Sequence, residues 1–479
     1  MFVLKNKLFM KILDFFSKYQ MFIIVSGLLL TLFFFIDKAL GVGIMFVFFL
    51  SASSLVVIGR CKEEKKRKIL SVLFLIVFAL YILSTLFFYY TKFQPFSDGY
   101  GDYIIYGSQA EQIAKRVHQG NFSLQNLSVQ GISLSHSYPV IVGYIYAFTI
   151  PSILVGQIFN AWLIALLVIF VYLIVLEIGG TQKEAFLTGL IACFYPSLAF
   201  YGSLLLKEAF VILLVLISLL LALRILKKFS IVNFFLFYIT LIALTNLRFY
   251  ISFAIILAFI VGWVLISGCK IKKRIIYGVI MMVLFGFLPQ ISCGYDYFGV
   301  NILKQNVNIQ SINFYKEVAY APVQPKDDSK PIVPGQRVQW SSYSAEKNST
   351  VIIKAGFENP ITFIKNTTLS YLYSLFGPLP WKFTKRSQLF SLPEIIMSYF
   401  LLFFVIKAMM ESFKNKNKII IPLVLFSFIV VSILALYMNN FGIATRIRMP
   451  AFLVLLCLLP LGFKNLKNIS IPSLDKLCQ

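Results

Sequence analysis

Apolar segments long enough to cross a lipid bilayer recur along most of this chain, for example at residues 155–178 and 209–226. A helix rises about 1.5 Å per residue, so about 20 apolar residues span a hydrocarbon core of roughly 30 Å. Of the 479 residues, 59% are hydrophobic and only 13% are charged. Soluble domains carry about a quarter charged residues. The pattern therefore predicts an all-α polytopic membrane protein.

Basic residues are concentrated in short loops between the apolar segments. Clusters of Lys and Arg at 60–68, 224–228, 270–274 and 414–418 contribute to a formal net charge of +25. Short loops rich in Lys and Arg stay on the cytoplasmic side of a membrane. This distribution fits a membrane topology and argues against nucleic acid as a partner. It predicts a multi-pass protein of a bacterial-type inner (cytoplasmic) membrane, with both termini in the cytoplasm.

Hydropathy predicts about twelve spans. They are residues 20–36, 40–59, 69–91, 155–178, 184–203, 209–226, 231–248, 250–268, 275–293, 393–410, 419–438 and 449–463. The spans divide the chain into four parts. These are a two-helix extension (1–68), a transmembrane module (69–294) with an exterior loop at 92–154, an exterior segment (295–392) and C-terminal transmembrane helices (393–479).

The exterior loop at 92–154 carries an amphipathic pattern instead of a span. Apolar residues recur at helical spacing between Tyr103 and Val117, and the polar residues lie largely elsewhere around the helix. Such a pattern is typical of a helix that lies in the membrane interface. We expect the segments 136–151 and 361–377 to form two further interfacial or partly embedded helices. The loop therefore places polar groups along the outer membrane surface.

This loop carries three acidic residues. Asp102 opens the amphipathic helix, Asp98 lies in the turn-forming string SDGYGD, and Glu111 and His136 follow. A carboxylate in this position can accept a proton from an incoming hydroxyl, and a divalent metal at Asp102 and Asp98 is compatible with the sequence without being indicated by it. Equally, Asp102 can be a helix N-cap and Asp98 a solvated turn residue. The residues alone leave both interpretations open.

Cations occur at the predicted outer ends of later helices. Lys207 and Glu208 begin one helix, Arg248 lies in the turn between two helices, and Arg446 and Arg448 precede the last span. Arginine binds phosphate through a planar bidentate fork. These cations therefore predict a site for a donor phosphate. Contact with lipid headgroups is the alternative, because long basic side chains reach the interface without a special partner.

The order of these features resembles a known family. An outward helix is followed by D-x-x-x-Y-x-x-x-A (Asp102, Tyr106, Ala110), HSYPVIVGY, QIFNAWLIALLVIFVYLIVLEIGG and ACFYPSLAFYGSLLLKEAF, with a weaker similarity in NNFGIATRIRMP. Together they are similar to the GT-C superfamily of polyprenyl-phosphate-dependent glycosyltransferases. The nearest comparison is with bacterial relatives of the protein O-mannosyltransferases and the lipid A aminoarabinose transferases. The resemblance covers about residues 69–268.

The resemblance implies a GT-C-like fold and a membrane glycosyltransferase. Its donor would be a polyprenyl-phosphate-linked sugar, and its acceptor a lipid-linked glycan, a cell-surface polysaccharide or a protein outside the membrane. It implies that Asp102 is the catalytic base or metal contact, with Asp98 as second choice, and that Lys207 and Glu208 form a second polar contact. The acidic pair common in that family is absent, since Tyr103 follows Asp102.

Two other functions fit parts of the pattern. An O-antigen-type polysaccharide polymerase or ligase would use exterior Arg and His residues, and the early Asp would be dispensable. A lipid or polysaccharide transporter would place charges near the bilayer midplane and would have discontinuous helices and repeat symmetry. The sequence has no phosphate-binding glycine motif, and its six cysteines form no C-x-x-C pair. No cofactor is indicated.

Overall fold

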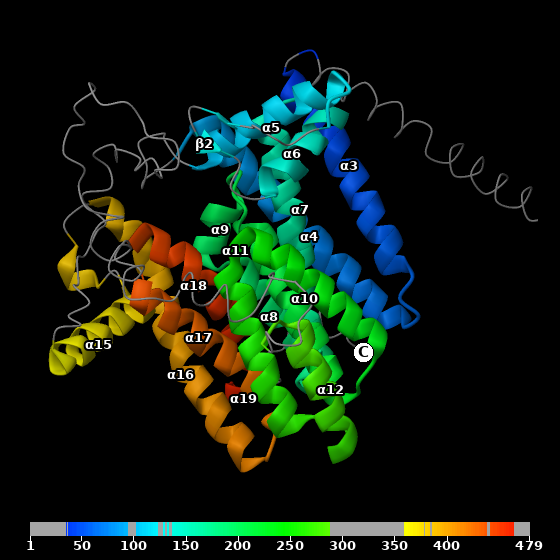
Figure 1. Ribbon diagram of the computed structural model, residues 1–479. Helices are drawn as coiled ribbons and strands as arrows, with labels where there is room; N and C mark the ends of the chain where they lie inside the picture. Colours follow the sequence, from blue (N-terminus) through cyan, green and yellow to red (C-terminus); the bar gives the residue numbers. More distant parts are fainter. Residues whose placement is uncertain are drawn as a thin grey trace, which may run out of the picture.

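The computed structural model describes residues 35, 37–93, 102–122, 128–129, 132–133, 137–287, 359–377, 379–383, 386–437 and 441–463. Within these ranges the chain is almost entirely helical, as predicted (Figure 1). The exceptions are two short antiparallel strands, β1 (Ser128–Val129) and β2 (Ile132–Ser133). The predicted span at 20–36, apart from residue 35, and most of the exterior segment at 295–392 lie outside the described residues.

Seven helices in the described part are long and apolar enough to cross a membrane. They are α3 (Lys38–Gly59), α4 (Glu64–Thr91), α7 (Ile153–Glu177), α10 (Glu208–Lys227), α11 (Ile231–Ile266), α16 (Leu392–Lys414) and α17 (Ile421–Tyr437). The other helices are α5 (Asp102–His118), α6 (Tyr138–Phe148), α8 (Gln182–Cys193), α9 (Pro196–Gly202), α12 (Ile271–Leu284), α15 (Pro360–Phe376), α18 (Phe441–Leu456), α19 (Leu459–Gly462), η3 (Pro380–Lys382), η4 (Arg386–Ser391) and η5 (Lys418–Ile420).

The predicted span at 184–203 is broken in the structure. Helices α8 and α9 are bent by 60° across a short break, and together they would make an eighth span. The break lies just before Pro196, where Tyr195 adopts an extended backbone conformation. Proline has no N–H to donate and disfavours helical backbone at the preceding residue. The structure therefore replaces one straight helix with two shorter ones.

The segment labelled α11 consists of two helical parts that meet at Arg248, where the sequence predicted a turn between two helices. Arg248 has non-helical backbone angles (φ −155°, ψ 90°). The rings of Phe237 and Phe259 are 4.9 Å apart. In a straight helix these residues would be separated by about 33 Å. Residues 231–247 and 249–266 therefore lie side by side, and Arg248 occupies the turn between them.

The predicted last span at 449–463 also differs from the structure. Helix α18 already begins at Phe441 and ends at Leu456, and α19 follows after a short break. Arg446 and Arg448 are therefore helical residues and not part of a loop that precedes a helix. Similarly, the described part of the predicted span at 275–293 is the shorter helix α12, which begins earlier, at Ile271.

The two helices predicted in the exterior loop are present, as α5 and α6, and they pack against each other at one end of the bundle (Figure 1). The buried face of α5 includes Tyr106, Ala110, Ile113 and Ala114, as the periodicity predicted. A Cβ atom at Gly143 of α6 would lie 2.6 Å from the Ile113 side chain. The close approach of α6 to α5 therefore requires glycine at this position.

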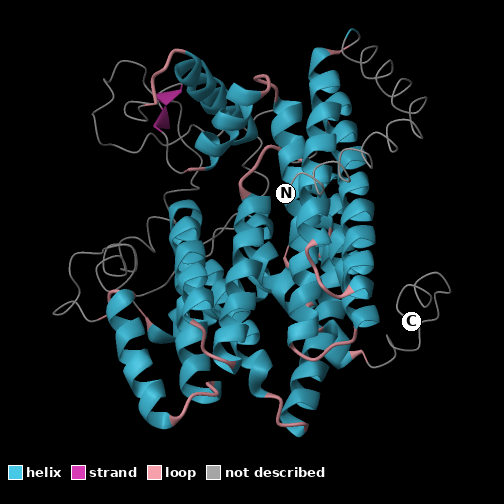
Figure 2. Cartoon of the chain, turned by 90° about the vertical axis from the view of Figure 1, so that its right-hand side faces the viewer, coloured by secondary structure: helices cyan, strands magenta, loops and turns pink. Residues whose placement is uncertain are grey.

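The predicted basic loops meet at the opposite end of the bundle. Glu177, at the end of α7, pairs with Arg224 and Lys227 at the end of α10. Two further hydrogen bonds lie at this end. Gln182 donates to Glu63, in the segment between α3 and α4, and Asn417, in the segment after α16, donates to the carbonyl oxygen of Ile178. Helix α7 runs from this end to the α5–α6 end, where it contacts α6. Figure 2 shows that the long helices of the bundle lie roughly parallel to one another. The structure thus separates a basic end from the end that carries α5 and α6.

The centre of the bundle is formed by α7 and α10, whose residues are buried on nearly all sides. The outer helices instead expose large apolar side chains, for example Phe400 and Phe403 of α16. A soluble protein rarely exposes an extended apolar surface of this kind. Buried central helices and apolar outer faces are what a multi-pass membrane protein requires.

Candidate functional site

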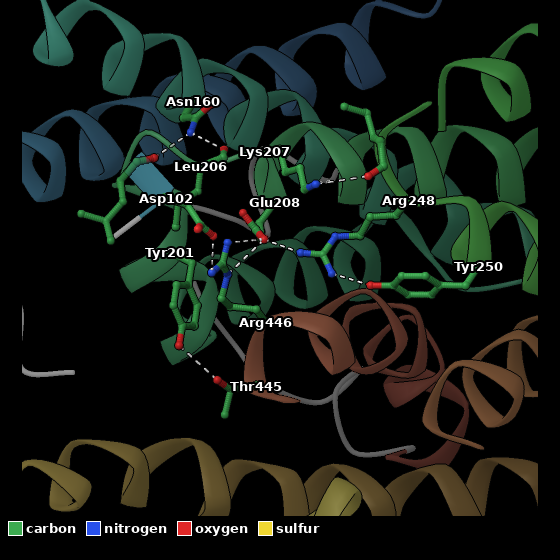
Figure 3. Close-up of polar contacts among 12 residues, drawn as sticks. Asp102, Asn160, Tyr201, Leu206, Lys207, Glu208, Arg248, Tyr250, Thr445 and Arg446 are labelled. Carbon is green, nitrogen blue, oxygen red and sulfur yellow. Dashed lines mark hydrogen bonds and ion pairs between the residues drawn. The ribbon is translucent and has the colours of Figure 1, made fainter. Parts of the chain in front are cut away.

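Five charged residues predicted to be functional come together where several helices begin or turn. Asp102 is the first residue of α5, and Lys207 and Glu208 are at the start of α10. Arg248 lies in the turn of α11, and Arg446 lies within α18. Figure 3 shows that Asp102, Glu208, Arg248 and Arg446 point toward one another. We call these five residues the charged cluster.

Glu208 is the centre of the charged cluster. Its side chain is only 3% exposed, and its Oε1 atom accepts hydrogen bonds from Arg446 Nε at 3.1 Å and Arg446 Nη2 at 2.9 Å. Arg248 Nη2 donates to the same oxygen. Among the residues that the structure describes, the Oε2 atom has no hydrogen-bond partner. Two guanidinium groups thus compensate a carboxylate that was predicted to lie at the surface.

Asp102 is bound less extensively than Glu208. Its Oδ2 atom accepts one hydrogen bond, 2.9 Å long, from Arg446 Nη1. The Asp102 side chain is 45% exposed, whereas that of Arg446 is 18% exposed. Arg446 therefore connects a buried carboxylate to one that solvent or a ligand can reach. The guanidinium of Arg446 also lies 5.7 Å from the centre of the Tyr201 ring, which supports its position.

Lys207 adds a third cation to the charged cluster. Its Nζ atom donates to the carbonyl oxygen of Leu247 at 3.3 Å, next to the turn that carries Arg248. Burial lowers the pKa of Lys207 to about 8, and the charge of Arg248 acts in the same direction. With all side chains ionised, three cations face two carboxylates, so the cluster has a net charge of +1. This arrangement favours an anionic ligand.

The loop that delivers Lys207 and Glu208 is fixed by a buried amide. Asn160 Nδ2 donates to the carbonyl oxygens of Leu204 and Leu206, both at 2.7 Å. Asn160 Oδ1 accepts from the hydroxyl of Tyr138 at 2.8 Å. These three bonds connect α7, the loop before α10 and helix α6. Asn160 thus holds the start of α10 in place next to the exterior-loop helices.

Arg448 does not join the charged cluster, contrary to the sequence-based prediction. It is 1% exposed, and it donates from Nη2 to Glu394 Oε1 at 2.8 Å and from Nη1 to the carbonyl oxygen of Gly377 at 2.7 Å. Tyr195 and Ser197 donate to the same Glu394 carboxylate. Helical residues two apart point about 200° apart, so Arg446 and Arg448 face different neighbours. Arg448 is thus committed to an internal ion pair.

The remaining predicted residues do not extend the charged cluster. Asp98 and His136 lie outside the described residues. Glu111 is exposed on α5 and pairs with Lys115 one turn later, at 2.8 Å. In the described ranges, no group of three His, Cys, Asp or Glu side chains is arranged to hold a metal ion. Arginine neutralises both carboxylates of the charged cluster, an arrangement that suits an anion better than a divalent cation.

Two buried polar residues were not singled out from the sequence, one that positions the start of α10 and one that pairs with Arg448 outside the charged cluster. Asn160 is a polar residue inside the apolar run QIFNAWLIALL, and Glu394 follows Pro393 at the start of an apolar helix. Polar residues within membrane-spanning segments are costly and often functional, so their position was a usable signal. Their partners, up to 199 residues away in sequence, could not be read from it.

Comparisons with known proteins give no further information on the site. No protein-family model, no curated protein and no solved structure matches this chain. The arguments that follow depend on the geometry of the charged cluster and on the chemistry of its residues.

Proposed function

We propose that this protein is an integral membrane glycosyltransferase of the GT-C type. It transfers a sugar from a polyprenyl-phosphate-linked donor to a lipid-linked glycan, a cell-surface polysaccharide or a protein. In this proposal the charged cluster faces the outer side of a bacterial-type inner membrane and the basic loops face the cytoplasm. The positive-inside distribution of Lys and Arg supports this orientation.

The single observation that carries the proposal is the pairing of half-exposed Asp102 with the partly buried Arg446 at the end of a membrane bundle. A lipid-linked sugar phosphate presents its headgroup at the membrane surface, where the interfacial helix α5 would place Asp102. A carboxylate next to cations is what transfer from a phosphate leaving group needs. Lys207 and the two arginines of the cluster supply that positive charge.

The proposed reaction is a displacement at the anomeric carbon of the donor sugar. An acceptor hydroxyl attacks this carbon and gives its proton to Asp102, while the bond between the anomeric carbon and the phosphate oxygen breaks. The polyprenyl phosphate leaves with the electron pair of that bond. General-base catalysis accelerates the attack, and cations stabilise the charge that develops on the departing phosphate.

Substitution of Asp102 tests the proposal directly. In reconstituted membranes supplied with radiolabelled polyprenyl-phosphate sugars, Asp102→Asn should lower transfer at least about a hundredfold, because the proton acceptor is lost. The protein should still be produced and should retain donor binding. Glu111→Gln is the matched control, since it removes a carboxylate from the same helix but outside the charged cluster.

Retained transfer by Asp102→Asn would contradict the proposed role of Asp102. Activity of that variant with a pyrophosphate-linked glycan would favour the O-antigen-type polymerase or ligase. The bent pair α8–α9 favours a second candidate, a lipid or polysaccharide transporter, because discontinuous helices are typical of that class. Movement of the donor across the vesicle bilayer without sugar transfer would support that candidate.

A further inference from the structure

Arg446 divides its hydrogen bonds between two carboxylates in different surroundings. Its Nε and Nη2 atoms bind Glu208, which is 3% exposed, and its Nη1 atom binds Asp102, which is 45% exposed (Figure 3). Arg248 holds Glu208 from a second direction. Glu208 is therefore the fixed counter-ion of Arg446, and Asp102 is the partner that a ligand can replace.

The two ion pairs of Arg446 differ in how strongly they resist exchange. An ion pair with a half-exposed partner contributes little to stability, because water and salt compete with it. Removal of a partner from a buried pair is much more unfavourable, since it leaves an uncompensated charge in a low-dielectric environment. An incoming anion will therefore displace Asp102 from Nη1 and leave the bonds to Glu208 intact.

We propose that Arg446 Nη1 is an exchange site at which Asp102 and the phosphate group of a ligand compete. The ligand is a phosphate monoester or diester, carried either by a lipid or free in solution. In the resting protein Asp102 occupies Nη1 as an internal substitute for the phosphate. When the phosphate binds, Asp102 leaves, and Arg446 continues to be held by Glu208.

The exchange has a consequence for catalysis that depends on the proposed glycosyltransferase function. Once Asp102 has left Arg446, both of its carboxylate oxygens are free to accept the proton of an acceptor hydroxyl. Binding of the donor phosphate thus frees the second oxygen of the base at the moment when the acceptor hydroxyl is to be deprotonated.

The competition makes a prediction with an unusual sign. If Asp102 competes with the ligand, Asp102→Asn should bind farnesyl phosphate about three- to fivefold more tightly than the unchanged protein. A carboxylate that instead helps to bind the ligand would weaken binding when removed. Dissociation constants would be measured by thermophoresis on the purified full-length protein in detergent, with farnesol and inorganic phosphate as further probes.

Two variants define the controls. Arg446→Ala should lose most of the affinity for farnesyl phosphate. Glu111→Gln lowers the negative charge of α5 by the same amount and should leave the affinity unchanged. Tightening for farnesyl phosphate alone identifies a lipid phosphate as the ligand, and tightening for inorganic phosphate as well identifies the phosphate group itself. Tightening for farnesol, or equal tightening in Glu111→Gln, would overturn the proposal.

The binding and transfer measurements separate this inference from the proposed function. Unchanged or weaker binding by Asp102→Asn, together with lost transfer, would remove the exchange and leave the glycosyltransferase proposal standing. If Asp102→Asn binds farnesyl phosphate more tightly but the unchanged protein transfers no sugar, the exchange is supported and the glycosyltransferase proposal is wrong. A second variant, Asp102→Ala, should reproduce the change in affinity, because it also removes the competing carboxylate.

Discussion

Lys207 is the cation of the charged cluster whose charge responds to pH. It faces Arg248, Glu208, Asp102 and Arg446, and burial is the main cause that lowers its pKa from 10.5 to about 8. Lys207 is therefore protonated in the folded protein below about pH 7 and loses its proton as the pH rises through 8. The unfolded chain keeps this proton up to about pH 10, so the contribution of Lys207 to stability increases with pH between 8 and 10.

The same titration should reduce phosphate binding. Between pH 7 and pH 9 the affinity of the protein for farnesyl phosphate should fall severalfold as Lys207 becomes neutral. Lys207→Arg should retain its affinity over this range, because arginine stays protonated. Binding curves recorded at intervals of half a pH unit would test this. An equal decline in both proteins would assign the titration to another group, such as the ligand.

The grouping of Lys207, Glu208, Arg248 and Arg446 could be anticipated, because each was predicted at the outer end of a helix. Their pairing could not. Glu208 was expected at the surface, yet it is buried among cations that come from 40 and 238 residues further along the chain. Sequence patterns report how a helix faces its surroundings. They do not report which distant side chain fills the space opposite.

At the scale of elements, α18 carries both arginines and depends on one of them for its packing. Arg448 fastens α18 to α16 through Glu394 and to the end of α15 through the carbonyl oxygen of Gly377. Removal of one partner from a buried pair typically costs about 3–5 kcal/mol. Arg448→Met should therefore unfold at a markedly lower temperature, and Arg448→Met with Glu394→Leu should recover part of the loss.

Arg446→Ala is the control for Arg448→Met, because Arg446 lies on the same helix, two residues away. It should lose phosphate binding while its unfolding temperature changes less than that of Arg448→Met. The unfolding temperatures of both variants would be measured in detergent, with size-exclusion chromatography to detect the folded protein. Phosphate binding would be measured with farnesyl phosphate, as above. Equal destabilisation by the two substitutions would show that α18 does not divide these roles.

Periodicity predicted the elements more accurately than their ends. The amphipathic pattern in the exterior loop located α5, and the paired prolines located α6. The bend between α8 and α9 was missed, because apolar composition continues through it. The early start of α18 was missed because Thr445, Arg446 and Arg448 make its first turns polar. Hydropathy measures compatibility with lipid. It contains little information about where a helix inside a bundle stops or turns.

For the whole molecule, the central feature is the difference between its two ends. One end holds the charged cluster and helices α5 and α6, and the other holds the basic segments around Glu177, Arg224 and Lys227. The exterior reaction proposed above requires that these ends lie on opposite sides of one membrane. Sequence alone predicted this separation from the alternation of apolar runs and basic loops, and the contacts of the bundle show the same grouping.

Cysteine labelling tests which end faces outward. In a variant whose six native cysteines are replaced, Gln119→Cys would report on the end of α5 and Lys414→Cys on the basic end of α16. Both residues are exposed. A membrane-impermeant maleimide added to intact spheroplasts should label the Gln119→Cys protein at once and the Lys414→Cys protein only after lysis. The reverse pattern would place the charged cluster in the cytoplasm, where a transferase acting on exterior acceptors cannot have its active site.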